Sequence, residues 1–208
     1  MSSPVGLVGG PTSGTPVDHV VDGVYPSAES ALEAGCEWIW FLDAAAQARP
    51  DALEHLLTVV QLEPERRKVL VAAGMIVDQA GRPSTPHLAR GAERATERVL
   101  ALAPRGLIPI RSAPFVHTLV AREAFERHGL PIADTFGPYA PVVWTARVLA
   151  EGVGYMVPAS VATLSAGAGE KQTIRDLGAA WHTARTGTWT RGETVRAFLA
   201  LRPGAEVR

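Results

Sequence analysis

The chain has 208 residues, of which 47% are hydrophobic and 20% are charged, and its formal net charge at pH 7 is −1. These values are ordinary for a soluble globular protein with one sizeable core, and the near-neutral charge excludes a general electrostatic attraction to nucleic acid. A single cysteine, Cys36, excludes an internal disulfide and favours a reduced, cytoplasmic setting. The first residues lack the features of a signal peptide, and no apolar run is long enough to cross a bilayer.

Apolar runs and amphipathic stretches alternate along the chain, which predicts strands alternating with helices. In the first part of the chain, the expected elements are a strand at 5–10, a second strand or extended segment at 18–26, a helix at 27–35, a strand at 37–43 and a helix from Pro50. They are followed by a strand or strand pair at 67–78, a loop at 79–91, and two strands and a short helix within 106–131. The last expected elements are a helix at 140–152 and a strand with a proline bend at 153–164. This order predicts an α/β fold with three layers, α/β/α, and a mostly parallel sheet. Residues 1–165 are expected to form the domain, and 166–208 an amphipathic helical tail that packs on it or on a partner.

The strongest strand signal is the run EWIWFLD, residues 37–43, which ends on Asp43. Three alanines follow, and Pro50 and Asp51 then suit the first turn of a helix. Because ligands bind at the carboxyl ends of strands in such sheets, Asp43 lies where a metal ligand or a ribose contact would be placed. The alternative, which is favoured, is that Asp43 only caps the turn beyond its strand.

Four segments within residues 27–164 carry a family pattern in the right order and frame. They are WIWFLDAAAQARPDAL, PFVHTLVAREAFERHGLP, FGPYAPVVWTAR and GVGYMVPASVATL. Together they resemble the family 2 glycosyltransferases with the GT-A fold, and most closely the rhamnosyl- and galactofuranosyl-transferase branch. The resemblance implies a GT-A-like domain that is shortened in its N-terminal, nucleotide-binding part, where only LVGGPTSG offers a counterpart.

The resemblance also implies a metal site, from which this chain departs. Members of the family hold Mg²⁺ or Mn²⁺ with a cluster of aspartates at the end of the strand that corresponds to 37–43. Here only Asp43 is present, because Ala44 and Ala45 occupy the other acidic positions. Hard cations need several oxygen ligands, which alanine cannot supply. We therefore expect neither the metal nor a nucleotide sugar to bind well as a cofactor.

The remaining acidic positions of the family are also replaced. Ala140 and Pro141 stand where the resemblance places an aspartate pair that includes the general base, so no proton acceptor is left there. Val143 replaces a glutamate, and Leu164 replaces a late histidine. Carboxylates without a metal destabilise a fold through repulsion and desolvation. Their joint replacement is therefore what a retained scaffold with abandoned chemistry would show.

No residue is assigned a catalytic, cofactor-binding or metal-binding role. The candidates for a remnant cleft are Asp43, His117, Asp134, Tyr139, Trp144 and Arg147. For His117 the choice is between a side chain that fills the donor-sugar pocket and an ordinary buried histidine with hydrogen-bond partners, which is commoner. Trp144 either faces the cleft or belongs to the core, and both interpretations stay open. Arg147 is either free to meet an anion or, as favoured, solvated.

Three functional hypotheses follow. The first is a catalytically inactive pseudo-glycosyltransferase that binds a protein partner, a second copy of itself or a glycan, in cell-envelope glycan biosynthesis. It would be cytoplasmic, with its Arg- and Trp-bearing tail able to touch the inner face of a membrane. The second is an active, metal-independent glycosyltransferase in which Asp43, Asp134 or Glu151 supplies the carboxylate. The third is a small-molecule-binding domain unrelated to sugars. The joint loss of acids favours the first.

Overall fold

The computed structural model describes residues 5–9, 19–21, 25–61, 68–84, 106–131 and 140–165. The strands are β1 (Val5–Gly9), β2 (His19–Val21), β3 (Trp38–Leu42), β4 (Ala46–Ala48), β5 (Val69–Val77), β6 (Pro83–Ser84), β7 (Ile108–Pro109), β8 (His117–Ala121) and β9 (Val153–Leu164). The helices are α1 (Tyr25–Glu33), α2 (Ala52–Gln61), α4 (Arg122–His128) and α6 (Ala140–Glu151). The predicted tail, 166–208, lies outside the described residues. Within those residues, no helix combines the length and the apolar character that crossing a membrane requires.

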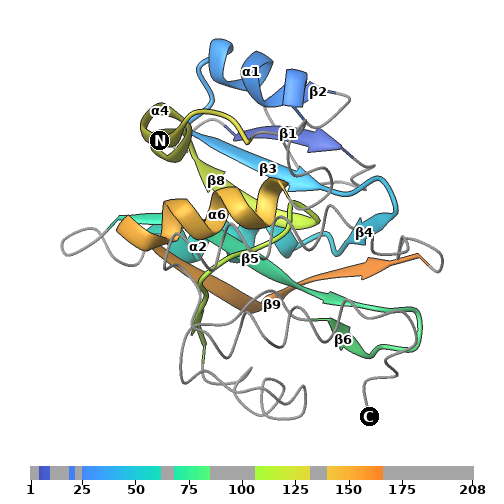
Figure 1. Ribbon diagram of the computed structural model, residues 1–208. Helices are drawn as coiled ribbons and strands as arrows, with labels where there is room; N and C mark the ends of the chain where they lie inside the picture. The colour runs from blue at the N-terminus through green and yellow to red at the C-terminus, as the bar shows by residue number, and fades with distance from the viewer. Residues whose placement is uncertain are drawn as a thin grey trace, which may run out of the picture.

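The described strands form one sheet with the order β2-β1-β3-β8-β5-β9-β4, with β6 beside β5 and β7 beside β9 (Figure 1). The pairings of β1 with β2, β1 with β3 and β5 with β9 are parallel, and the other five are antiparallel. The expectation of a mostly parallel sheet is therefore wrong for the described strands, whose sheet is mixed. The reason is that β8 runs against both of its neighbours, and a continuously apolar strand does not reveal its direction.

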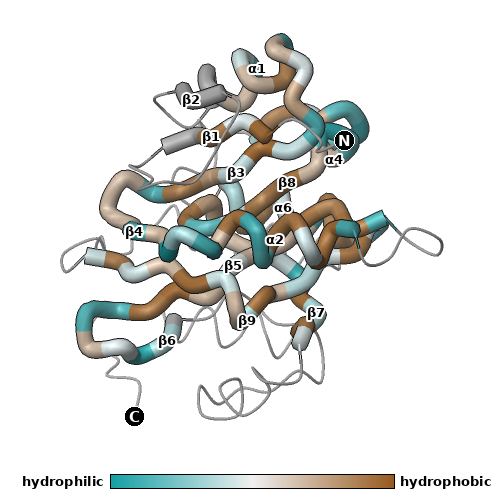
Figure 2. Tube along the Cα trace, turned by 180° about the vertical axis from the view of Figure 1, so that it is seen from behind, coloured by the Kyte–Doolittle hydropathy of each residue, from teal (hydrophilic) through white to brown (hydrophobic). Residues whose placement is uncertain are grey.

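Helices lie on both sides of this sheet. α2 packs on β5 and β9 from one side, and α6 packs against β5 from the other, as Figures 1 and 2 show from opposite directions. α1 lies against β1 and β2, and α4 follows directly from β8 and contacts α6. The α/β class predicted from the alternation of elements is therefore confirmed.

The central strands are buried on both faces. All residues of β3 and β8 are buried, and so are all but the last residue of β5. A strand covered on both sides needs a continuous apolar run, as in WIWFL. Hydrophobic colours predominate along these strands in Figure 2, whereas the turn between β5 and β6 is hydrophilic.

Most expected elements lie near their predicted places. α1 begins two residues earlier than expected and is followed by Gly35 at φ 84°. α4 ends as predicted at Gly129, whose φ is 68° and whose N–H donates to the carbonyl oxygen of Phe125. β4 was not predicted, because its residues have little strand propensity. It forms through its antiparallel pairing with the end of β9.

Candidate functional site at the end of β3

Asp43 follows the last residue of β3, where the chain turns toward β4. Its Oδ1 accepts a hydrogen bond from the N–H of Ala45 at 2.8 Å, and its carbonyl oxygen accepts the N–H of Ala46 at 2.8 Å. Its own N–H donates to the carbonyl oxygen of Val116 at 2.8 Å, which fastens the turn to the segment before β8. The exposed Asp43 carboxylate thus caps its own turn, as the simpler interpretation of the sequence expected.

The short strand β4 brings the end of β9 to this turn. Ala46 is paired with Leu164, and the N–H of Ser165 donates to the carbonyl oxygen of Ala45 at 2.9 Å. Residues 43–46 and 164–165 are therefore neighbours in space, although about 120 residues separate them in sequence. Among 43–46 and 164–165, Asp43 carries the one ionisable side chain.

The residues at this turn do not fit a hard cation. Mg²⁺ and Mn²⁺ sites gather several carboxylate, carbonyl or water oxygens. Asp43 supplies one carboxylate, and one of its oxygens is already hydrogen-bonded to the turn. No three His, Cys, Asp or Glu side chains within the described ranges lie close enough together to hold a metal ion.

The other positions at which the resemblance expects acidic residues, 140, 141 and 143, lie in the first turns of α6. Ala140, Pro141 and Val143 are all buried, and Ala140 is only 1% exposed. Pro141 suits this place because a helix does not need the N–H of its first residues. A carboxylate at any of the three positions would be shielded from water, where an unpaired charge is costly.

His117 lies in the interior, at the first residue of β8. The indole Nε1–H of Trp40 donates to His117 Nδ1 at 3.1 Å, and His117 Nε2 lies 2.8 Å from the Ser160 hydroxyl oxygen. The Ser160 hydroxyl donates in turn to the carbonyl oxygen of Ala52 at 2.7 Å. We call these four linked groups the buried polar chain. It joins β3, β8, β9 and α2, and His117 is therefore a satisfied core histidine.

The chemistry of the partners decides where the His117 proton lies. An indole nitrogen can only donate, so Nδ1 must accept and Nε2 must carry the hydrogen. Nε2–H then donates to the Ser160 oxygen, whose own hydrogen points to Ala52. Every polar group of the buried polar chain has a hydrogen-bond partner when His117 is neutral. Burial lowers the pKa of His117 from 6.5 to about 4, which agrees with a neutral ring at physiological pH.

Two irregularities in the sheet make room for the buried polar chain. Gly74 of β5 is paired with Val157 and Met75 with Val161, so residues 158–160 of β9 bulge away from the ladder. Bulges re-aim side chains, and this one directs Ser160 toward His117 and α2. A Cβ on Gly74 would lie 2.1 Å from the His117 ring, so only glycine leaves space for that ring.

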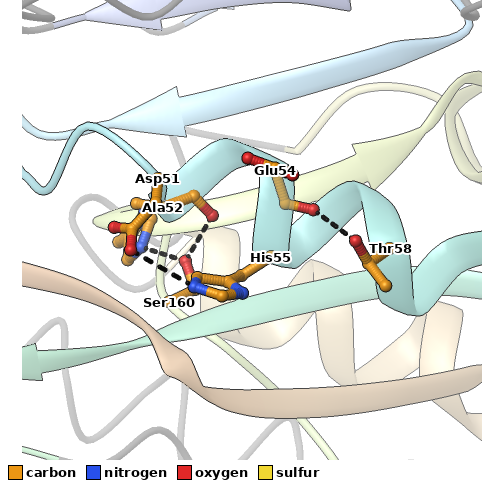
Figure 3. Close-up of polar contacts among 7 residues, drawn as sticks. Asp51, Ala52, Glu54, His55, Thr58 and Ser160 are labelled. Atoms are coloured by element: carbon orange, nitrogen blue, oxygen red, sulfur yellow. Dashed lines mark hydrogen bonds and ion pairs between the residues drawn. The ribbon is translucent and has the colours of Figure 1, made fainter.

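Figure 3 shows how the start of α2 meets the bulge. The Ser160 hydroxyl reaches the carbonyl oxygen of Ala52, the first residue of the helix. On the same helix, His55 Nε2 lies 3.4 Å from Asp51 Oδ2, and both side chains are substantially exposed. Ser160 is fully buried and is engaged with His117, so these serine and histidine groups do not form an accessible nucleophilic centre.

Trp144 belongs to the core. Its ring stacks on Phe125 with the centroids 4.8 Å apart and meets Phe115 edge-on at 5.8 Å, and its Nε1–H donates to the carbonyl oxygen of Gly129 at 2.8 Å. Phe41 of β3 completes this aromatic cluster by stacking on Phe115 at 3.9 Å. A tryptophan with its polar atom satisfied and its ring between two phenylalanines is not a platform for an external sugar.

The other candidates lie apart from Asp43 or outside the described residues. Arg147 is exposed, and one of its terminal nitrogens donates to the carbonyl oxygen of His128 at 3.2 Å. Asp134 and Tyr139 fall in 132–139, outside the described residues. Sequence analysis missed Gly74 and Ser160. An isolated glycine in a strand is a known signal of close approach, whereas nothing in the sequence points to Ser160.

Comparison with known proteins supports the fold and little more. No family model matches the sequence, and no curated protein matches it. The crystal structure of A197 from STIV covers 77% of this chain and 84% of its own, with 12% identity and a TM-score of 0.47. The crystal structure of GalNAc-T7 with UDP, GalNAc and Mn²⁺ covers 80% of this chain at 13% identity, with a TM-score of 0.51.

The chain has a glycosyltransferase-like fold. It spans 36% of the GalNAc-T7 chain, and at 13% identity the likeness concerns the fold alone. UDP, GalNAc and Mn²⁺ belong to that neighbour, and what this chain binds has to be argued from its own residues.

Proposed function

We propose that this chain is a pseudo-glycosyltransferase: a scaffold of the family 2, GT-A type that no longer transfers sugar and acts by binding. The observation that carries the proposal is the turn after β3. One carboxylate oxygen of Asp43 caps that turn, and the neighbouring residues Ala44, Ala45 and Leu164 have no side-chain atom that can ligate a metal.

The buried start of α6 supports the same proposal. In the aligned frame Ala140, Pro141 and Val143 replace acids, and all three are buried in this structure. Without a metal, carboxylates there would repel one another and lose hydration, so their removal stabilises the fold. The replacements therefore favour the stability of the fold over catalytic activity.

A protein of this fold without catalytic activity would function through what it binds. The proposed partner is another protein or a second copy of this chain, with a glycan as the further candidate ligand, in cell-envelope glycan biosynthesis. These roles rest on the resemblance of the four sequence segments and on the loss of the acids. They require no metal and no nucleotide sugar.

The first test is a thermal-shift screen of the purified chain with UDP-, GDP- and dTDP-sugars, each with and without Mn²⁺. A ligand that binds only the folded state raises the unfolding temperature. The proposal expects the same unfolding temperature with and without Mn²⁺ for every donor. A Mn²⁺-dependent increase that saturates at micromolar donor would overturn it.

A turnover assay addresses the rival hypothesis of an unconventional active site. Release of the nucleoside diphosphate from any of the donors, abolished in Asp134→Ala and retained in Asp51→Ala, would make the chain an enzyme. We expect no release above the buffer rate from the parent chain or from either variant. Asp51 is the matched control because it is an exposed aspartate immediately before α2.

A further inference from the structure

A cavity of about 340 Å³ lies at the end of the sheet opposite Asp43, where β3 and β5 begin and β8 ends. Its size is within the range of small-molecule sites, about 300–1,000 Å³. Trp38 of β3 and Ala121 of β8 line it, and the other lining residues are all charged: Glu37, Lys68, Arg122, Glu123, Glu126 and Arg127. None of the candidate residues of the β3 turn belongs to it.

The side of the cavity next to β3 carries an excess of negative charge. Glu126 lies 3.6 Å from the Arg122 guanidinium, and the exposed Glu37 makes no ion pair among the described residues. Arg122 is partly occupied elsewhere: its Nε donates to the carbonyl oxygen of Cys36 at 3.1 Å, and a terminal nitrogen donates to that of Leu32. Two carboxylates against one guanidinium leave one net negative charge on this side.

The side next to β5 has the opposite charge. Lys68 Nζ lies 2.6 Å from Glu123 Oε2, and Arg127 pairs with the other oxygen of the same carboxylate. The hydrogen bond from Lys68 lowers the pKa of Glu123, so this carboxylate is ionised at neutral pH. Two cations share one anion, which leaves one net positive charge. More than half of the Lys68 and Arg127 side chains is exposed and available to a ligand.

The sheet sets the spacing of the strands that carry these two charges. In the strand order β8 lies between β3 and β5, so Glu37 and Lys68 flank it from either side. Two strand spacings amount to about 10 Å. Trp38, which is 8% exposed, contributes the apolar part of the cavity lining together with Ala121.

We infer that this cavity binds a small zwitterion of the size of a free amino acid, with its ammonium group toward Glu37 and Glu126 and its carboxylate toward Lys68 and Arg127. A ligand with charge of one sign would meet repulsion on one side, whereas a zwitterion of matching length satisfies both sides. The inference does not depend on the proposed function, because it uses the other end of the sheet.

The test is isothermal titration calorimetry of the full chain with the free L-amino acids and glycine betaine. For each free amino acid that binds, the N-acetyl derivative removes the positive charge and the amide removes the negative charge. At least one free amino acid is expected to bind with a saturable heat, and each of its two derivatives is expected to bind at least about tenfold more weakly.

Two variants identify the end that each charge occupies. Glu37→Gln is expected to weaken the free amino acid about tenfold but to leave its N-acetyl derivative unchanged, and Lys68→Gln is expected to spare the amide instead. Arg82→Gln is the matched control, because it breaks the exposed Arg82–Asp78 pair at the other end of β5. Unfolding temperatures of all three variants establish that they are folded.

Three results would overturn the inference: no saturable heat from any zwitterion, derivatives that bind as well as the parent amino acid, or unchanged affinity in both Glu37→Gln and Lys68→Gln. Failure here would leave the pseudo-glycosyltransferase proposal intact. Conversely, Mn²⁺-dependent binding of a nucleotide sugar would overturn that proposal without affecting this cavity.

Discussion

The two ends of the central strands differ in how they use polar groups. At the end of β3, Asp43 is held by its own turn, and the polar chain beneath it is buried and fully satisfied. At the beginning of β3, Glu37 and five other charged side chains surround an open cavity. The resemblance to glycosyltransferases directs attention to the first end, whereas the cavity lined by charged side chains lies at the second. Fold and function therefore have to be argued separately.

This contrast predicts that changes at the Asp43 end alter stability, whereas changes at the cavity alter binding. The largest loss is expected for His117→Ala, which removes a buried ring and leaves the Trp40 indole N–H without its acceptor. The free energy of unfolding should fall by about 3–5 kcal/mol, measured by urea denaturation. The matched control, His55→Ala on the exposed side of α2, should change it by less than about 0.5 kcal/mol. Equal losses in the two variants would remove the special role of the buried polar chain.

Gly74→Ala should cost about 2–3 kcal/mol, because its Cβ would collide with the His117 ring. In the His117→Ala background the same change should cost at least about 1 kcal/mol less, since the colliding ring is gone. The double-mutant cycle is measured by urea denaturation of the four proteins. Additive costs would contradict the contact between Gly74 and His117.

The pH dependence of stability should be an effect of similar size. Burial lowers the pKa of His117 from 6.5 to about 4, so protonation favours the unfolded chain. The contribution of the neutral ring is fully present above pH 6.5 and is lost as the pH falls toward 4, by about 3 kcal/mol in all.

Unfolding of the parent chain should therefore become easier between pH 6.5 and 4, with a steeper dependence than in His117→Gln. NMR titration of the His117 ring gives an independent check. A midpoint near 4 is expected, and a midpoint near 6.5 would mean that the ring is not buried as described.

The smallest effect concerns Asp43 itself. Asp43→Ala removes the acceptor for the N–H of Ala45 and should lower the free energy of unfolding by about 1 kcal/mol. Asp43→Asn keeps a carbonyl oxygen at the same place and should cost only a few tenths of a kcal/mol. Thermal denaturation compares the two. If asparagine were as damaging as alanine, the negative charge rather than the turn would matter.

The sequence anticipated the local elements better than the sheet. The continuous apolar run WIWFL and the helix start at Pro50 are local signals, and both elements lie within a few residues of their predicted places. The antiparallel direction of β8 and the existence of β4 depend on pairing with strands that are distant in sequence. The local sequence pattern does not reveal such pairing. The sheet was therefore expected to be mostly parallel and is mixed.

The candidate site residues likewise divide into those whose contacts are local in sequence and those whose partners are distant. The capping of a turn by Asp43 needs only residues 43–46, and the structure shows it as expected. The partners of His117 lie 77 and 43 residues away, so sequence analysis could propose a satisfied histidine but could not name Trp40 and Ser160. The cavity at Glu37 combines three segments of the chain, 37–38, 68 and 121–127, and no short motif predicts it.

Electron paramagnetic resonance of Mn²⁺ shows directly whether the turn after β3 holds a metal ion, which the pseudo-glycosyltransferase proposal says it does not. Free aqueous Mn²⁺ gives a sharp six-line signal that broadens when the ion is bound by a protein. We predict that the parent chain and Asp43→Asn both leave this signal as it is in a protein-free sample with the same Mn²⁺ and UDP. A further loss of the signal in the parent chain with UDP, absent in Asp43→Asn, would show a working metal site at Asp43 and overturn the pseudo-glycosyltransferase proposal.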